Sequence, residues 1–167
     1  MKKAKRYHVE GGIRIRGITF EIPNGYGKYL YEILSDLELN RFNWRIGAGE
    51  FYKKENNTLG EPLFPSLCTV NGETLFEIIS KEEYYLIFVD LKAFDNKLDV
   101  KEIATYPEFV VSECQFILLV VDSSYVTIYS KNQNIIQQLF SKGVIAGYKN
   151  IEYITDENDR NTTLIAF

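Results

Sequence analysis

The sequence predicts a single α+β domain, in which two main helices pack on a mostly antiparallel sheet. Strand-like segments rich in aromatic and β-branched residues follow one another through short turns, which favours antiparallel pairing. Only two segments space their apolar residues clearly as a helix does. The 167 residues and the hydrophobic fraction of 46% match one ordinary globular domain.

Alternating residues predict the strands of the first half. Residues 13–20 alternate isoleucine with arginine until Gly17, where the phase changes, so we expect a strand with a bulge there. Residues 42–53 predict two short strands, with a glycine-containing turn at residues 47–49 between them. A loop is expected over residues 55–65.

Two apolar segments in the second half predict the centre of the sheet. Residues 84–91 are apolar on both faces, which is typical of a central strand covered on both sides. Residues 116–121 have the same character, and Asp122-Ser123-Ser124 is expected to turn the chain into a strand at 125–130. Two further strands are expected to close the sheet, at residues 151–155 and 163–167.

Helical spacing of apolar residues predicts the two main helices. The first is expected to start at Asn24 as N-cap. Its apolar positions are Tyr26, Tyr29, Leu30, Ile33, Leu34 and Leu37. The second has one apolar face over residues 135–140 and is expected to end at Gly143. Asn71 and Gly72 predict a turn, and for residues 74–80 we favour a short helix over a strand.

Charge and hydropathy limit the classes of partner. The net charge of −4 gives no general attraction to nucleic acid or to an anionic membrane, so we expect neither as a partner. No apolar run approaches the ~18 residues that span a bilayer, and a cytoplasmic location is expected. The exception is a basic block at Lys2, Lys3, Lys5 and Arg6. We interpret residues 1–12 as a flexible basic extension and residues 13–167 as the domain.

Several common chemistries lack the residues that they need. The only histidine, His8, lies in the basic extension, which argues against histidine-based catalysis. The glycine spacing from Gly12 to Gly17 resembles a P-loop, but Ile18 stands where the phosphate-binding lysine is required. Cys68 and Cys114 are isolated. We therefore predict no catalytic residue, no metal site and no cofactor.

Two segments are candidates for ligand binding. Gly25-Tyr26-Gly27-Lys28 lies between a predicted strand and helix, where free N–H groups and a lysine could hold a phosphate. Trp44, Arg45 and Tyr52 mix aromatic rings with a guanidinium group, as base-stacking sites do. The alternatives are an ordinary chain reversal at the glycines, and a core in which the rings point inward and the arginines outward.

The sequence resembles one known family throughout the part that follows Arg16. The resemblance rests on the segments 16–18, 20–24, 26–28, 42–44, 49–50, 63–65, 84–88, 119–123, 125–129 and 152–159, among them Phe42-Asn43-Trp44 and Leu63-Phe64-Pro65. It is similar to the DUF2691 family of Bacillus-like bacteria. This resemblance implies an intracellular, Gram-positive setting and carries over no activity.

Three functional hypotheses follow. The first is a non-catalytic module that binds another protein, in a regulatory, phage-related or toxin-neutralising role, because the chain is acidic, rich in aromatics and without a catalytic constellation. The second is a site for a phosphorylated or nucleotide-like small molecule, built from Gly25, Gly27, Lys28 and Arg45. The third is an enzyme that uses carboxylates such as Glu50, Asp90 or Asp122, which requires two of them to face each other across a cleft.

Overall fold

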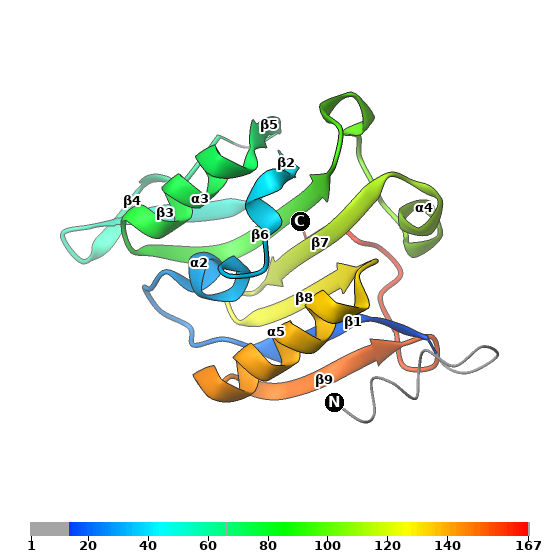
Figure 1. Ribbon diagram of the computed structural model, residues 1–167. Helices are drawn as coiled ribbons and strands as arrows, with labels where there is room; N and C mark the ends of the chain where they lie inside the picture. The colour runs from blue at the N-terminus through cyan, green and yellow to red at the C-terminus, as the bar shows by residue number, and fades with distance from the viewer. Residues whose placement is uncertain (1–13, 66, 167) are drawn as a thin grey trace.

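The computed structural model describes residues 14–65 and 67–166. Nine strands of this part of the chain form one open, antiparallel sheet, as Figure 1 shows. Along its main path the strands lie in the order β4-β3-β6-β7-β8-β1-β9. The predicted α+β class with an antiparallel sheet is confirmed. The basic extension predicted for residues 1–12 lies outside the described residues.

The elements have the following bounds. The strands are β1 (Ile15–Glu21), β2 (Asn43–Ile46), β3 (Glu50–Glu55), β4 (Thr58–Pro62), β5 (Cys68–Asn71), β6 (Tyr84–Phe94), β7 (Cys114–Val121), β8 (Tyr125–Ser130) and β9 (Lys149–Thr155). The helices are α2 (Tyr29–Leu34), α3 (Gly72–Lys81), α4 (Tyr106–Val111) and α5 (Gln133–Ala146). Short 3-10 turns occur at Leu39–Arg41 and Lys97–Asp99.

The expected turn at residues 47–49 does not reverse the chain. Strands β2 and β3 both pair with β6 and follow each other along its edge, β2 beside residues 91–94 and β3 beside residues 84–88. The glycines allow a close approach here, because a Cβ on Gly49 would lie 2.5 Å from the carbonyl oxygen of Phe88. The prediction of two strands was correct, and the predicted turn between them was wrong.

The loop predicted for residues 55–65 contains strand β4. It forms a hairpin with β3 whose turn residues Asn56 and Asn57 have φ values of 50° and 61°, as a type I′ turn requires. The strand escaped prediction because it is an exposed edge that contains Gly60 and Pro62, both unfavourable in strands.

Both main helices differ from their predicted boundaries. Helix α2 starts at Tyr29 and not after Asn24, because Gly27 pairs with Tyr84 in a bridge that holds the preceding residues extended. Helix α5 continues past Gly143 to Gly147, whose φ of 78° makes it the C-cap. The short helix at 74–80 is confirmed as α3, and its N-cap is Asn71, which accepts a bond from the Thr74 N–H.

Several predicted strands are confirmed. Strands β7 and β8 form the expected hairpin, with positive φ at Asp122 and Ser123. The pairing of β1 with β9 shifts register at Gly17, whose Cβ would lie 1.8 Å from the Ile128 carbonyl oxygen. The strand predicted at 163–167 is wrong for its described residues, which form no strand. They lie across the sheet, where the Leu164 N–H donates to the carbonyl of Ala104.

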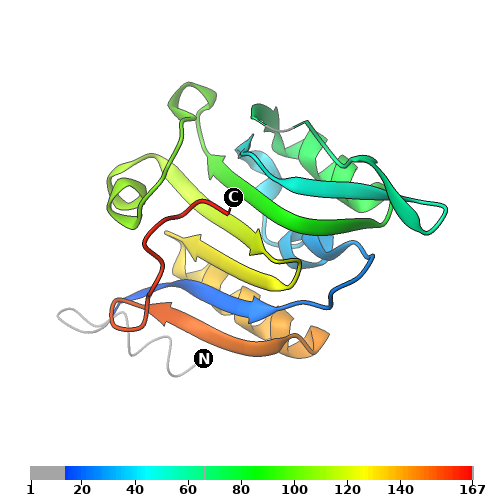
Figure 2. The same cartoon turned by 180° about the vertical axis from the view of Figure 1, so that it is seen from behind.

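The sheet has two differently covered faces. Helices α2, α3 and α5 lie on one face, here the front face, and enclose the larger core cluster, which includes Trp44, Leu86 and Val126 (Figure 1). The opposite, back face carries α4, residues 95–105 and the C-terminal segment 156–166, here the C-terminal strap (Figure 2). These elements enclose a second cluster that includes Phe109 and Leu164.

Candidate binding surface

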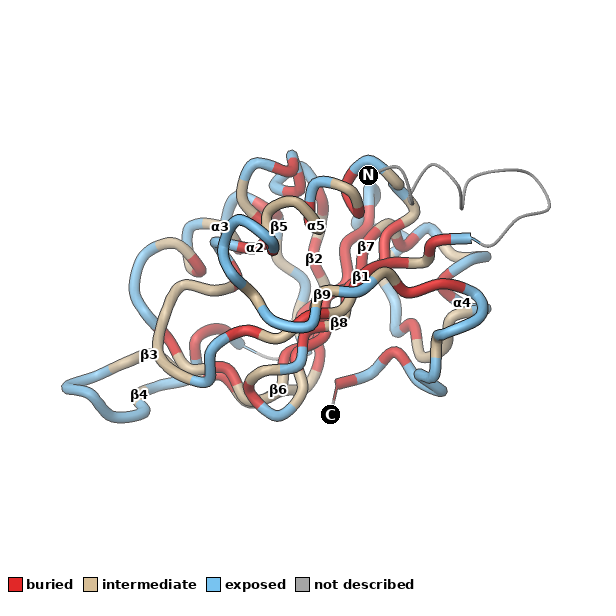
Figure 3. Tube along the Cα trace, turned by 90° about the horizontal axis from the view of Figure 1, so that it is seen from below, coloured by how far each residue is buried: buried red, intermediate tan, exposed pale blue. Residues whose placement is uncertain are grey.

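The back face is covered over only one half. In Figure 2 the strap crosses the half formed by the last residues of β6 and the first residues of β7, α4 lies beside the start of β7, and no described element crosses the other half. Figure 3, seen from below, shows the same bare region under β3 and the start of β6. We call the two regions the covered half and the open half. The open half is lined by Tyr52, Tyr85, Ile87 and Tyr125, and Val121 lies at its border, packed against the second core cluster.

Strand alternation places these five residues on the back face. Phe51 pairs with Leu86, and both belong to the front core, so the next pair, Tyr52 and Tyr85, lies on the opposite face. In the same way the front-face pair Val120 and Val126 is followed by Val121 and Tyr125. The sequence therefore directs aromatic rings to a face that nothing in the described chain covers.

The open half is apolar but accessible. The side chain of Tyr125 is 54% exposed, and Tyr52, Tyr85, Ile87 and Val121 are half-buried. Tyr85 is held in place, because its ring contacts Tyr26 edge to face at 5.8 Å. An aromatic face with fixed rings and exposed edges is typical of protein interfaces.

The charged residues around the open half are mainly acidic. By strand alternation Glu21, Glu50 and Glu152 also lie on the back face, and Asp122 lies in the adjoining β7–β8 turn. None of these four carboxylates takes part in the ion pairs of the described residues. Two cations lie nearby: Lys54, which is neutralised by Glu83 at 3.0 Å, and Lys149, which stands opposite Glu21 in the pairing of β1 with β9. The surface therefore favours a cationic partner.

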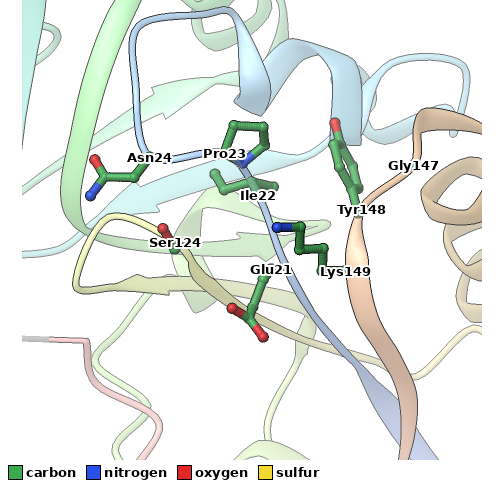
Figure 4. Close-up of a pocket in the computed structure, with 8 residues that line it drawn as sticks. All are labelled: Glu21, Ile22, Pro23, Asn24, Ser124, Gly147, Tyr148 and Lys149. Atoms are coloured by element: carbon green, nitrogen blue, oxygen red, sulfur yellow. The ribbon is translucent and has the colours of Figure 1, made fainter.

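A small polar pocket of about 260 Å³ lies at the end of the sheet, beside the open half. Figure 4 shows that its wall includes Lys149, whose amino group points toward the interior, and the hydroxyl of Ser124. The ring of Tyr148 stacks on Phe20 at 5.2 Å. Its hydroxyl is buried without a hydrogen-bond partner among the described residues, and burial raises the pKa of this phenol.

A buried ion cluster marks the border between the two halves. Lys92 is fully buried, and its Nζ lies 2.6 Å from the carboxylate of Asp90, which is 2% exposed. Glu102 lies 3.5 Å from Lys92 and 3.1 Å from Arg45, which closes the cluster toward solvent. Desolvation raises the pKa of Asp90, and the charge of Lys92 opposes this shift. The backbone of Ala166, near the end of the strap, also hydrogen-bonds to Asp90.

A second polar cluster fastens the strap at its other end. The guanidinium of Arg16 bonds to Asp156 at 2.9 Å and to Asp159 at 3.1 Å. The buried hydroxyl of Tyr129 donates to the same Asp159 carboxylate at 3.0 Å and accepts from Asn161 at 2.9 Å. Since Asp159 is only 2% exposed, these bonds replace its hydration. The strap is therefore fixed to the body at both ends.

The six predicted ligand residues do not form one site. The Gly27 N–H already donates to the carbonyl of Tyr84, and Lys28 precedes a helix of only six residues. Trp44 is fully buried in the front core, where its indole N–H donates to Leu39, so it offers no surface to a ligand. The interpretation of an inward ring is correct for Trp44.

The remaining predicted residues lie elsewhere. Gly25 lies in the loop between β1 and α2, with no atom within 4 Å of its Cβ position. Arg45 belongs to the buried ion cluster on the back face. Tyr52 lies in the open half, and it also lines a pocket of about 170 Å³ at the sheet edge together with Glu50. Tyr52 is thus the predicted residue that lies in the candidate surface.

The three candidate carboxylates have different surroundings. Asp90 is buried against Lys92, Asp122 is exposed in the β7–β8 turn, and Glu50 lies on β3 opposite Phe88. Asp90 is thus committed to an internal ion pair, which removes it as a freely accessible acid or base.

Sequence reasoning missed most of the open half. Tyr85 and Ile87 alternate with Tyr84 and Leu86. This period of two was a usable signal that the two pairs lie on opposite faces of the sheet. The ion pair of Lys92 with Asp90 had a weaker signal, namely two charges with a spacing of two in an apolar strand. The roles of Glu102 and of the strap had no signal in the sequence, because their contacts join residues that are far apart in the chain.

Comparisons with known proteins agree with the resemblance found in the sequence. The family described as "Protein of unknown function (DUF2691)" matches residues 15–165. The uncharacterised protein YncE of Bacillus subtilis (strain 168) is 38% identical over 149 residues, which cover 89% of this chain and 97% of that protein. No solved structure is significantly similar to the chain. None of the described helices is long and apolar enough to cross a membrane.

Proposed function

We propose that this chain, which belongs to the DUF2691 family, is a non-catalytic module that binds another protein through the open half of its sheet. The observation that carries the proposal is the unequal cover of one sheet face. The strap and α4 cover one half of the back face, and no described residue covers the tyrosines of the other half. Aromatic residues of this kind are enriched in protein interfaces.

The chemistry of the molecule also supports a binding role. Its most deeply buried charged groups, Lys92 and Asp90, neutralise each other instead of facing a cleft. The proposal places the module in the cytoplasm of a Gram-positive bacterium or its phage, in a regulatory role. In that compartment the free thiols of Cys68 and Cys114 would stay reduced.

Site-specific photocrosslinking tests the proposal. A photoreactive phenylalanine analogue replaces Tyr125 in the open half, and in a matched control it replaces Tyr31 on α2, which is 40% exposed on the other side of the molecule. The full chain is expressed at its native level in a Bacillus host and irradiated. We expect a discrete protein adduct from position 125 and none from position 31. Equal adducts at both positions, or none at either, would contradict the proposal.

A second candidate function is recognition of a small anion in the polar pocket beside the open half. It is favoured by the position of Lys149, which points into the pocket and has no ion pair among the described residues. The volume of about 260 Å³ lies below the ~300 Å³ at which pockets for drug-sized ligands begin, which favours phosphate or a small carboxylate over a nucleotide.

Thermal stability measured with phosphate, citrate and acetate tests this candidate. Binding to the native state raises the melting temperature. We expect a rise with one of these anions that is lost in Lys149→Ala and kept in Lys28→Ala. A rise that depends on Lys28 would instead support the site predicted at Gly25, Gly27 and Lys28, and no rise with any of the anions would remove this second function.

A further inference from the structure

We infer that the partner presents a basic amphipathic helix to the open half. This inference rests on the proposed function and specifies the chemistry of the partner. It follows from three properties of the surface: its hydrogen bonding, its width and its charge.

The hydrogen bonding of the sheet favours a helix as the occupant. Strands β6, β7 and β8 are paired on both sides, so the peptide groups under the open half are already satisfied. A segment that binds to this sheet face must therefore pair its backbone N–H and C=O groups within itself, as a helix does. Helices α2, α3 and α5 cover the front face of this sheet in the same manner.

The width of the open half suits a single helix. From Glu50 on β3 to Glu21 on β1 the open half crosses β6, β7 and β8, and Glu152 lies one strand further, on β9. Four strand spacings of roughly 4.8 Å make a width of about 19 Å. A helix of about 13 residues has this length. A second sheet would need more room, and the strap and α4 already occupy the adjoining half.

The charge of the rim sets the character of the helix. Glu50 lies at one side of the open half, and Glu21 and Glu152 lie at the other, with the tyrosines between them. A helix that lies across the strands, with an apolar stripe and with lysine or arginine near both of its ends, would place its cations against both groups of carboxylates. Burial of the rings supplies affinity, and the flanking charges supply orientation and selectivity.

A second copy of the chain does not have this chemistry in its described helices. Among the residues of α2, α3, α4 and α5 the cations are Lys81 and Lys142. Lys142 is half-buried and bonded to Ser35, and Lys81 shares its helix with Glu73 and Glu77. The complementary helix is therefore expected from a different protein.

The test uses a labelled 14-residue peptide of leucine and lysine with helical amphipathic spacing, titrated with the full chain and followed by fluorescence anisotropy. One comparison peptide replaces lysine with glutamate, and another keeps the lysines but replaces leucine with serine. We expect binding of the leucine–lysine peptide alone, weakening as salt is raised.

Charge-reversal variants locate the binding. The double substitution Glu50→Lys and Glu152→Lys reverses two charges at the rim of the open half. The matched control, Glu73→Lys and Glu77→Lys, makes the same change of net charge at exposed positions of α3. We expect the first pair to weaken binding about tenfold or more and the second less than about twofold. Tyr125→Ser is expected to weaken binding without any change of charge. Thermal melts show whether each variant remains folded.

The outcomes separate this inference from the proposed function. Equal weakening by both charge-reversal pairs, or equal binding of the glutamate peptide, overturns the inference. If Tyr125 crosslinks to a partner while the leucine–lysine peptide does not bind, the proposed function stands and the helix inference is wrong. Dimerisation of the chain in sedimentation that Tyr125→Ser abolishes would also overturn it, because the occupant would then be a second copy.

Discussion

The two halves of the back face are built from the same strands and yet have opposite environments. On β6 the first residues carry Tyr85 and Ile87 to the open half, and the last residues carry Asp90, Lys92 and Phe94 to the covered half. The chain covers the half that contains the ion pair of Lys92 with Asp90, and the cost of burying these charges is offset because they are paired with each other. The described residues leave uncovered the half whose tyrosines tolerate water on one side. Under the proposed function, the covered half serves stability and the open half serves binding.

The largest expected effect comes from breaking the ion pair under the strap. Asp90→Ala leaves the ammonium of Lys92 buried without its closest partner. We expect a loss of about 3–5 kcal/mol in the free energy of unfolding, measured by urea denaturation. As a control, Glu50→Ala in the open half should stay within about 0.5 kcal/mol of the unmodified chain. A loss below about 1 kcal/mol for Asp90→Ala would mean that Lys92 reaches water or another carboxylate.

The next effect concerns the apolar contact of the strap. Leu164 is fully buried in the back core, and its neighbour Ile165 is 36% exposed. We expect Leu164→Ala to cost about 2–4 kcal/mol in urea denaturation, because it leaves a cavity beneath the strap. Ile165→Ala should cost less than about 1 kcal/mol. Similar small losses from both would show that the strap does not support the covered half.

A smaller effect is expected from the polar fastening of the strap. Tyr129→Phe removes the hydroxyl that donates to the buried carboxylate of Asp159, while Arg16 remains. We expect the free energy of unfolding to fall by about 1–3 kcal/mol, because one hydrogen bond to a charged group is removed.

The same variant carries a pH dependence. Burial, together with the nearby Asp159, raises the pKa of Tyr129 above the ordinary value of 10. As the pH rises past 10, the unfolded tyrosine loses its proton while the folded one keeps it, so stability falls. Urea midpoints between pH 8 and 11 should fall less steeply for Tyr129→Phe than for the unmodified chain. An equal slope would assign the alkaline loss to other buried tyrosines, such as Tyr84 and Tyr148.

The smallest effect on stability is expected in the open half. Tyr125→Ser should change the free energy of unfolding by no more than about 0.5 kcal/mol, because the ring is more than half exposed. It should nevertheless weaken binding of the leucine–lysine peptide. A large loss of stability would place Tyr125 in the core and erase the difference between the two halves.

The elements that sequence reasoning identified well are those fixed by neighbouring residues. The β7–β8 hairpin was predicted because apolar strands flank Asp122 and Ser123, which tolerate positive φ. The bulge at Gly17 was predicted from a change of phase. The end of α5 was misplaced, because Gly143 is a plausible cap by type. The glycine instead allows close packing of the helix on β9, since a Cβ at this position would lie 3.1 Å from Ile151.

The candidate site was predictable only in part. Trp44 and Tyr52 have an even spacing, so a regular strand would put both on one face. The irregular pairing between Ile46 and Phe51 changes the phase, which sends Trp44 to the front core and Tyr52 to the open half. No local pattern announces such a bulge, because it depends on the partner strand β6.

The sequence by itself determined the class of fold, the central strands and the family, since these depend on composition, periodicity and short motifs. It also determined that aromatic side chains would alternate with core residues along β6 and β8. Only the tertiary structure decided which of those residues are covered. That decision depends on the strap, whose anchors Arg16 and Asp159 lie 143 residues apart in the chain. Contacts over such separations form when the whole sheet is assembled, and no window of neighbouring residues contains them.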